Sequence, residues 1–309
     1  MKRVFFVVGP TAVGKTGVAI ELAQEFEAEI VNADAFQIYQ GLDILTAKAD
    51  EEMQRRVRHH LLSQVSLAET MSAAKFRELA RAALADIHAR QKNAIVVGGS
   101  GLYVKAITHG FDPVPPPDPT LREELSALPQ TELARRLQTL SPDLAARTDL
   151  KNPRRVIRAI EIASASTVIP SGAKGSRGSR LKGFAAGSLG SARDDGVLLL
   201  RERDDLYQRI NERVNAMFGD GVEEEVRALQ DVGPTPASAL GLKEIRALIA
   251  GQISREECIA KIQQATRRYA KRQLTWFRHQ TTFAQLNLTP FSYREALCAI
   301  TQMFRRAQE

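Results

Sequence analysis

The segment Gly9-Pro10-Thr11-Ala12-Val13-Gly14-Lys15-Thr16 decides the fold of this 309-residue chain. An apolar run at residues 4–8 precedes it, and an amphipathic segment at 17–26 follows it. Two glycines, a lysine and a threonine at this spacing, between a strand and a helix, are typical of a phosphate-binding loop. In such a loop Lys15 reaches the terminal phosphate and Thr16 binds Mg²⁺. The alternative is a glycine turn with a surface lysine, and the motif does not identify the phosphate compound.

Two further strands are expected to end at the same edge as this loop. Residues 30–32 form one strand, which ends at Asp34, and residues 94–97 form another, which ends in Gly98-Gly99-Ser100. Between them, apolar residues at 71–90 recur at helical spacing, which predicts a helix. This alternation predicts an α/β fold with a P-loop NTPase-like parallel sheet core flanked by helices. Because the carboxyl ends of the strands face the ligand, Asp34 and Ser100 should border the phosphate site.

A proline-rich segment at 111–119 interrupts this alternation, and its five prolines predict a stiff exit from the core. Short helices at 121–128, 131–140 and 152–163 then predict an inserted helical subdomain. Residues 164–193 are rich in Ser, Gly, Ala, Lys and Arg, which predicts a mobile basic loop that includes 171–180. The predicted division is a catalytic core at 1–112 and 197–309, and an insertion at 113–196.

The C-terminal part returns to the core with a strand at 197–200, followed by a long helix or a helix pair at 204–230. The last strong helix is expected at about 255–279. On that helix Arg267, Lys271 and Arg278 fall within about 40° of one another at 100° per residue. No acidic residue interrupts positions 265–280. The basic face is either a solvated surface or a binding face for a phosphate backbone.

Composition favours a globular protein with an anionic partner. The chain has 44% hydrophobic residues, and 43 Lys and Arg against 36 Asp and Glu give a net charge of +7. Cys258 and Cys298 lie in helix-like segments without metal-ligand spacing, which fits a reducing cytoplasm. The start Met1-Lys2-Arg3 leads directly into the first strand, and no apolar run approaches the ~18 residues of a membrane span. We therefore predict a cytoplasmic protein without membrane contacts.

Several side chains near the loop could carry chemistry. Asp34 is the best-placed carboxylate and could act as a general base or hold Mg²⁺ through water, or it could cap the following segment. Ser100 offers a hydroxyl at a neighbouring strand end, or serves only the turn. Arg209 and Arg213 lie one helical turn apart and could clamp a diphosphate, or pair with acids on their own helix.

With these residues identified, the chain resembles the tRNA dimethylallyltransferase family, prenyltransferases that modify the adenosine next to the anticodon. The matching motifs occur in family order over almost the whole chain, and together they are highly specific. They are Gly9–Thr16, Asn32-Ala33-Asp34-Ala35-Phe36-Gln37-Ile38-Tyr39, Leu42-Asp43-Ile44-Leu45-Thr46-Ala47-Lys48, Val97-Gly98-Gly99-Ser100-Gly101-Leu102-Tyr103 and Lys271-Arg272-Gln273-Leu274-Thr275-Trp276-Phe277-Arg278.

The resemblance implies that the loop binds the diphosphate of dimethylallyl diphosphate instead of a nucleotide. Asp34 would receive a proton from the adenine N6 amine as that nitrogen attacks the allylic carbon, and Ser100 and Arg213 complete the catalytic set. Ser100 stands where the family usually has threonine. Mg²⁺, held by Thr16, would act with Lys15 and Arg213 on the departing diphosphate.

The resemblance also implies that the anticodon stem-loop of tRNA is the partner and that the target base leaves the stacked loop to reach Asp34. We expect a monomer. The residues implied in tRNA contact are Asp34, Ala35, Phe36, Gln37, Ser100, Arg122, Arg154, Arg155, Val156, Ile157, Arg158, Lys271, Arg272, Gln273 and Arg278. Three positions depart from the family pattern: Leu45 replaces a glycine, Ala49 a proline and Leu242 a tyrosine.

Three other functions remain open from the residues alone. A phosphate-loop kinase for a small molecule would bind ATP and would not depend on RNA. An adenylate isopentenyltransferase would use a free nucleotide and would have little use for the insertion and the basic C-terminal helix. A non-catalytic RNA-binding module would not need Lys15, Thr16 and Asp34 together.

Overall fold

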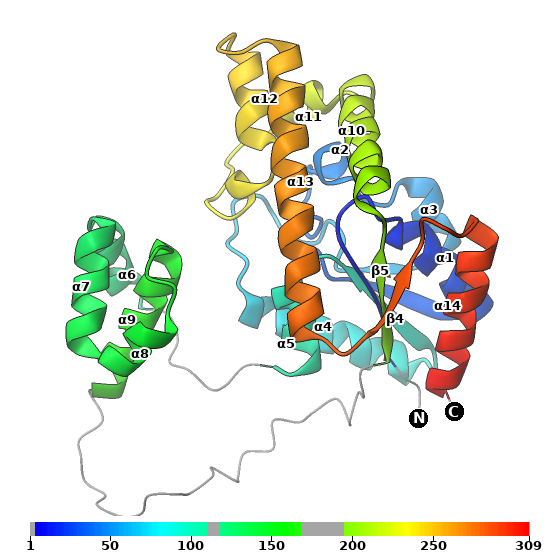
Figure 1. The fold of residues 1–309 in the computed structure, drawn as a ribbon, viewed down its shortest axis with the longest axis horizontal. Coiled ribbons are helices and arrows are strands. Elements are labelled where there is room, and N and C mark those ends of the chain that lie inside the picture. The colour runs from blue at the N-terminus through cyan, green and yellow to red at the C-terminus, as the bar shows by residue number, and fades with distance from the viewer. Residues whose placement is uncertain (1–3, 111–117, 168–194, 309) are drawn as a thin grey trace, which may run out of the picture. The chain divides into compact units, whose positions relative to one another are not determined.

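The computed structural model describes residues 4–110, 118–167 and 195–308, and it divides the chain into two compact units. One unit combines residues 1–110 with 187–309, and the other spans 111–186 (Figure 1). Residues 168–193 of the predicted mobile basic loop, including 171–180, lie outside the described residues. Residues 164–167, which we expected in that loop, belong instead to the end of a helix.

The first unit contains a six-stranded, all-parallel sheet in the order β3-β2-β4-β1-β5-β6. The central strands are buried on both faces, which explains why they read as continuous apolar runs. The predicted parallel α/β core is therefore confirmed. The strands are β1 (Val4–Val8), β2 (Ala28–Asn32), β3 (His59–His60), β4 (Asn93–Gly98), β5 (Gly196–Leu200) and β6 (Ala284–Asn287).

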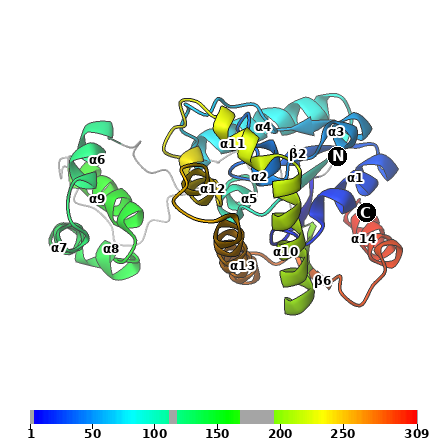
Figure 2. The same ribbon diagram turned by 90° about the horizontal axis from the view of Figure 1, so that it is seen from above.

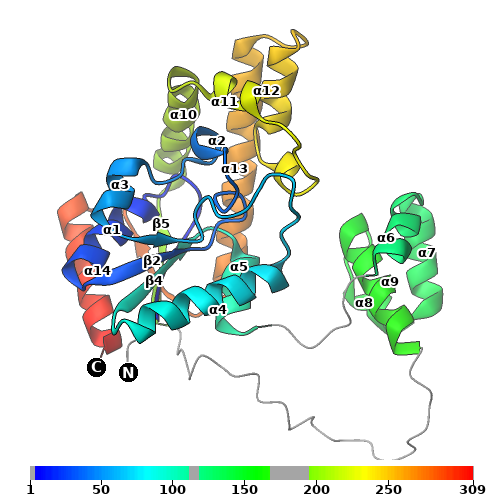
Figure 3. The ribbon, with the colours of Figure 1, turned by 180° about the vertical axis from the view of Figure 1, so that it is seen from behind.

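Helices cover both faces of this sheet, with α1 and α14 on one side and α4 and α5 on the other (Figures 2 and 3). Two short helices, α2 (Asp43–Thr46) and α3 (Glu51–Arg56), follow β2. The covering helices are α1 (Lys15–Glu25), α4 (Ala73–Ala89), α5 (Gly101–Thr108) and α14 (Tyr293–Gln308).

The predicted helical segment at 204–230 is a pair, α10 (Arg203–Gly219) and α11 (Val222–Ala228). The break falls at Gly221, whose φ of 94° lies in the left-handed region that glycine adopts without strain. A turn η1 (Pro236–Ser238), a short helix α12 (Leu242–Ile249) and the long α13 (Arg255–Gln280) follow. Helices α10, α11 and α12 stand beyond the carboxyl ends of the strands, and α13 starts beside them and runs down along the sheet toward the start of β6 (Figure 1).

Helix α13 has the two faces that its sequence predicts. Its buried stripe faces the protein, while Lys271, Arg272 and Arg278 are exposed. The buried stripe is not uniformly apolar, because it contains two polar side chains that border the site described below. It consists of Cys258, Ile262, Thr266, Ala270, Gln273 and Phe277.

Two elements after residue 279, the strand β6 and the helix α14, were not predicted from the sequence. The Phe304 ring of α14 packs against Phe26 and Phe5, with ring centroids 4.2 and 4.9 Å away. The helical spacing of Ala296, Ile300 and Phe304 was a usable signal for α14. The short strand β6, with the sequence Ala-Gln-Leu-Asn, has no long apolar run and is held by its pairing with β5.

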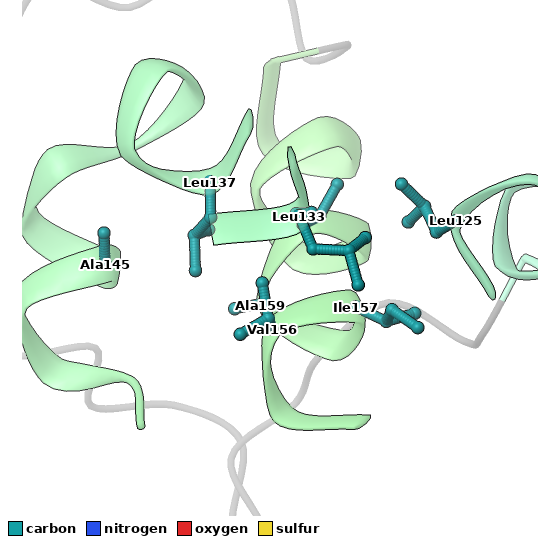
Figure 4. Close-up of a cluster of buried hydrophobic side chains, with 8 residues drawn as sticks. Leu125, Leu133, Leu137, Ala145, Val156, Ile157 and Ala159 are labelled. Carbon is teal, nitrogen blue, oxygen red and sulfur yellow. The ribbon is translucent and has the colours of Figure 1, made fainter. Parts of the chain in front are cut away.

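The second unit is a small helical bundle with its own apolar core, formed mainly by α7 and α9 (Figure 4). Leu133 and Leu137 of α7 face Val156 and Ile160 of α9, and Leu125 of α6 adds to them. The predicted helices are present, and α8 is an additional one. The helices are α6 (Pro119–Ser126), α7 (Gln130–Leu140), α8 (Pro142–Arg147) and α9 (Pro153–Thr167).

Across residues 4–110, 118–167 and 195–308, none of the helices combines the length and the hydropathy that a bilayer span requires. The cytoplasmic location and the monomeric state stay predictions.

Candidate active site

The loop after β1 wraps backward because three of its residues take left-handed backbone conformations. Gly9, Ala12 and Gly14 have φ values of 152°, 64° and 105°. A side chain at Gly9 would also collide with the backbone of β5, since a Cβ built there lies 2.6 Å from the Leu199 carbonyl oxygen. Gly14 then starts α1, so that the N–H groups of the first turn can face an anion.

Two arginines of α10 hold this loop from the side. The Arg213 guanidinium donates to the Thr11 Oγ1 at 2.6 Å, and the Arg209 Nε donates to the Ala12 carbonyl at 2.9 Å. Of the two roles that the spacing left open, the structure therefore places both arginines against the phosphate loop. Their guanidinium groups are therefore placed to contact a diphosphate held in the loop.

Lys15 begins α1 and turns back over the loop, where its Nζ donates to the Pro10 carbonyl oxygen at 2.8 Å. Burial in the cavity lowers the pKa of Lys15 to about 8. The charge of Asp34 raises this pKa and the charge of Arg213 lowers it, but both act less strongly than burial. A phosphate brought to the loop would stabilise the ammonium form that burial disfavours.

Asp34 follows β2 at the edge of the sheet and uses one carboxylate oxygen for local structure. Its Oδ1 accepts hydrogen bonds from the backbone N–H groups of Phe36 at 2.9 Å and Gln37 at 3.3 Å. The capping role considered from the sequence is therefore real. It does not occupy the whole carboxylate, because Oδ2 makes no hydrogen bond within the described part of the chain. Asp34 is held in one orientation with one oxygen left over.

Gln273 of α13 joins the phosphate loop to the end of β4. Its Oε1 accepts from the Thr11 backbone N–H at 2.9 Å, and its Nε2 donates to the Gly99 carbonyl at 2.9 Å. The side chain is buried. The resemblance implied that Gln273 contacts RNA, and in the structure its side chain supports the loop. This supporting role was not predicted from the sequence.

Replacement of Gln273 by alanine is expected to raise the KM for the phosphate substrate about tenfold. It leaves the Thr11 N–H and the Gly99 carbonyl without partners, and each costs about 1–3 kcal/mol when buried. Steady-state kinetics and thermal unfolding measure the two effects. Gln264→Ala, at an exposed position of the same helix, is the control. An unchanged KM in Gln273→Ala would contradict this role.

The groups described above line a single cavity of about 420 Å³. Its charged end contains the phosphate loop, Asp34, Arg209 and Arg213. Its other end is apolar and includes Leu45, Val214, Met217, Leu240 and Ile262. A cavity with these two ends fits a small molecule that has an anionic head and a short apolar tail.

The helices show how the two ends are separated. On α10, Met217 follows Arg213 by one turn, about 5.4 Å along the axis. Leu45 and Ile262 lie side by side across Gly241, because a Cβ built on Gly241 would be 3.1 Å from Leu45 Cδ1 and 3.5 Å from Ile262 Cδ1. Leu45, one of the departures from the family pattern, is thus part of the apolar wall.

Two residues in or behind the cavity wall were not identified from the sequence. Tyr269 lies one turn before Gln273 on α13 and lines the cavity, where burial raises the pKa of its hydroxyl. Glu225 of α11 supports the wall from outside, because its carboxylate accepts from the N–H groups of Asp43 and Ile44, both at 2.7 Å, and of Leu45 at 2.9 Å. It therefore fixes the short helix α2 that carries Leu45.

The other predicted residues of this unit fall in four places. Phe36, Gln37 and Arg272 line the cavity, and the Gln37 Nε2 donates to the Thr46 carbonyl at 2.9 Å. Ser100 precedes α5, and its N–H donates to the Ala33 carbonyl at 3.3 Å; it is outside the described lining of the cavity. Lys271 and Arg278 line a second cavity. Ala35 lies beside Asp34 at the sheet edge. Their contacts with RNA stay predictions.

In the helical unit, Glu161 is buried and holds two arginines. Arg122 Nε and Nη2 donate to its two oxygens at 2.7 and 2.8 Å, and Arg158 Nη1 donates at 2.8 Å. Arg154 and Arg155 are exposed at the start of α9. Val156 and Ile157, also implied in RNA contact, are buried in the core of the unit, where their side chains contribute to packing.

Comparison with known proteins shows the family to which this chain belongs. The model of the family described as IPP transferase matches residues 37–280. A tRNA dimethylallyltransferase of an Exiguobacterium species is 42% identical over 285 residues, which cover 90% of this chain and 88% of that protein. The crystal structure of the full-length tRNA isopentenylpyrophosphate transferase of Bacillus halodurans has a TM-score of 0.70 and 32% identity, and covers 100% of this chain and 98% of its own. The chain therefore belongs to the IPP transferase family.

Proposed function

We propose that this protein transfers a dimethylallyl group from dimethylallyl diphosphate to N6 of the adenosine next to the anticodon of a tRNA. The observation that carries the proposal is the cavity that Lys15, Arg213 and Asp34 line together with several apolar side chains. Family membership and the curated relatives, which are named tRNA dimethylallyltransferases, support it.

In the proposed reaction the N6 lone pair forms a bond to C1 of the allylic group while the bond from C1 to the diphosphate oxygen breaks. The diphosphate leaves with that electron pair, and Lys15, Arg209, Arg213 and the loop N–H groups stabilise its negative charge. The proton lost from N6 passes to the free oxygen of Asp34. An exocyclic amine is a poor base, so this transfer accompanies or follows carbon–nitrogen bond formation.

Mg²⁺ fits this site as a partner of the substrate. Thr16 offers a hydroxyl at the first turn of α1, and Asp34 and Asn32 line the same cavity. Within the described residues no three His, Cys, Asp or Glu side chains gather to hold a metal ion alone. Mg²⁺ is commonly held by one or two protein oxygens together with phosphates and water. These residues provide the protein oxygens. When bound, it would neutralise charge on the diphosphate.

The decisive experiment combines the protein with labelled dimethylallyl diphosphate, Mg²⁺ and unmodified tRNA. We expect the label to move into the RNA and to be recovered as N6-(dimethylallyl)adenosine after digestion. Free AMP as the acceptor and ATP as the donor are the controls, since they test the adenylate isopentenyltransferase and the kinase. Label that stays in the diphosphate pool, or that transfers only to AMP, would refute the proposal.

A further inference from the structure

Leu45 is a buried side chain in the wall of the cavity of about 420 Å³, and it belongs to the short helix α2. It faces Gly241, where a Cβ built on the glycine would lie 3.1 Å from Leu45 Cδ1 and 3.5 Å from Ile262 Cδ1. Leu45 therefore occupies space that a side chain at position 241 would otherwise need. Because the family pattern has glycine in place of Leu45, this bulk in the wall is a feature of the present chain.

Hydrogen bonds at both ends hold the four-residue helix α2 in place. At its start, the Glu225 carboxylate accepts from three consecutive backbone N–H groups, including that of Leu45 at 2.9 Å. Just after its end, the buried Lys48 Nζ donates to the Ser63 Oγ at 2.9 Å and to the Asp43 carboxylate. A helix this short is not stable alone, so these contacts decide where it lies. Leu45 is therefore a fixed boundary of the cavity.

The same network ties Leu45 to Asp34, beside which the reaction is proposed to occur. The Asp34 Oδ1 accepts from the Gln37 N–H at 3.3 Å, and the Gln37 Nε2 donates to the carbonyl oxygen of Thr46, the next residue after Leu45, at 2.9 Å. In the proposed reaction C1 of the allylic group meets N6 beside the free oxygen of Asp34. The apolar tail attached to C1 therefore begins close to the wall that carries Leu45.

We propose that Leu45 determines the length of the allylic tail that the protein accepts. The wall leaves room for the five carbons of a dimethylallyl group and excludes the ten carbons of a geranyl group. A close-packed wall discriminates in this way because additional carbons must displace side chains that have no free space behind them. This inference rests on the proposed function, since it specifies the donor of the same reaction.

The test compares dimethylallyl diphosphate with geranyl diphosphate as donors to an unmodified anticodon stem-loop, using the full-length protein. We expect the wild type to have a kcat/KM at least about 100-fold lower for the geranyl donor. Leu45→Ala should raise kcat/KM for the geranyl donor about 10- to 100-fold, because it opens the wall. The same change should lower kcat/KM for the dimethylallyl donor by up to about tenfold, because packing contacts with the shorter tail are lost.

Three further variants make the result specific. Leu45→Met conserves volume and should keep the preference for the shorter donor. Leu45→Val is a smaller truncation that should shift the preference in the same direction as Leu45→Ala but by less, and it serves as the test if Leu45→Ala folds poorly in thermal unfolding. Leu84→Ala truncates a buried leucine of α4 that is not among the cavity-lining residues of the described chain, and it should leave the preference as in the wild type.

Two results would overturn the assignment. One is a ratio of kcat/KM for the two donors that stays at the wild-type value in both Leu45→Ala and Leu45→Val. The other is a change in the KM for RNA with that ratio unaltered, which would mean that the wall borders the base and not the allylic tail.

Failure of this inference is distinguishable from failure of the proposed function. Transfer from dimethylallyl diphosphate to RNA by the wild type is measured first, and it does not depend on any Leu45 variant. Titration calorimetry with each diphosphate and the protein alone then compares the two tails without an acceptor. If the wild type transfers the group and neither measurement responds to Leu45→Ala or Leu45→Val, only the role given to Leu45 is wrong.

Discussion

Asp34→Asn is expected to lower kcat by about 10²- to 10⁴-fold, the usual contribution of a positioned general base. The amide cannot accept the N6 proton at the free oxygen position. Its own Oδ1 can still accept from the Phe36 and Gln37 N–H groups, so the loop should keep its shape. Rapid-quench measurement of prenyl transfer at saturating substrates gives kcat, and Kd for tRNA should stay within about twofold because the substitution preserves the local hydrogen bonds.

Asp50 provides a matched control for this substitution. It also uses Oδ1 to cap a backbone N–H, that of Met53 at 2.8 Å, but it lies at the start of α3, outside the cavity lining. Asp50→Asn should therefore leave kcat unchanged. Turnover of Asp34→Asn equal to that of Asp50→Asn would remove Asp34 from the mechanism.

Lys15→Met should lower kcat/KM by about 10²- to 10³-fold, as expected when a donor aimed at developing negative charge is removed from a water-poor site. Methionine preserves the length and most of the apolar contacts of the side chain, so the loss reports the charge. Kinetics with dimethylallyl diphosphate as the varied substrate measure it. Lys75→Met, on the exposed side of α4, is the control.

The lowered pKa of Lys15, about 8 in the ligand-free protein, gives this residue a second signature. Above that pH the Lys15 side chain of the free protein is largely uncharged. Binding of a diphosphate is then coupled to the uptake of one proton by Lys15. Affinity for dimethylallyl diphosphate should therefore weaken by up to tenfold per pH unit as the pH rises above about 8. Titration calorimetry checks this, and the slope should be absent in Lys15→Met.

The sign of the accompanying stability change follows from the same shift. Between the folded pKa of about 8 and the unfolded value of 10.5, the unfolded chain holds a proton that the folded chain has released. The contribution of Lys15 to the free energy of unfolding of the ligand-free protein therefore rises with pH across this window. Lys15→Met removes that contribution. Denaturant titrations of the wild type and of Lys15→Met at pH 7 and pH 10 therefore measure it as the difference in the free energy of unfolding between the two proteins.

The sequence by itself determined the loop at residues 9–16 between a strand and a helix, the parallel α/β core and the position of Asp34 at a strand end. Each of these follows from a local pattern: the loop from eight consecutive residues, and the strands, with Asp34 after the second of them, from short apolar runs. The basic face of α13 likewise follows from a helical period. Such patterns can be recognised in the sequence because backbone sterics and burial act on residues that are neighbours in the chain.

Only the tertiary structure decided how the loop is supported and what else surrounds it. Gln273 binds Thr11 across 262 positions, and Arg213 binds Thr11 across 202, so neither partner could be recognised from spacing. The apolar end of the cavity likewise collects residues from helices that are separate in sequence. Such contacts depend on how packed helices bring distant side chains together, which leaves no periodic signal in the chain itself.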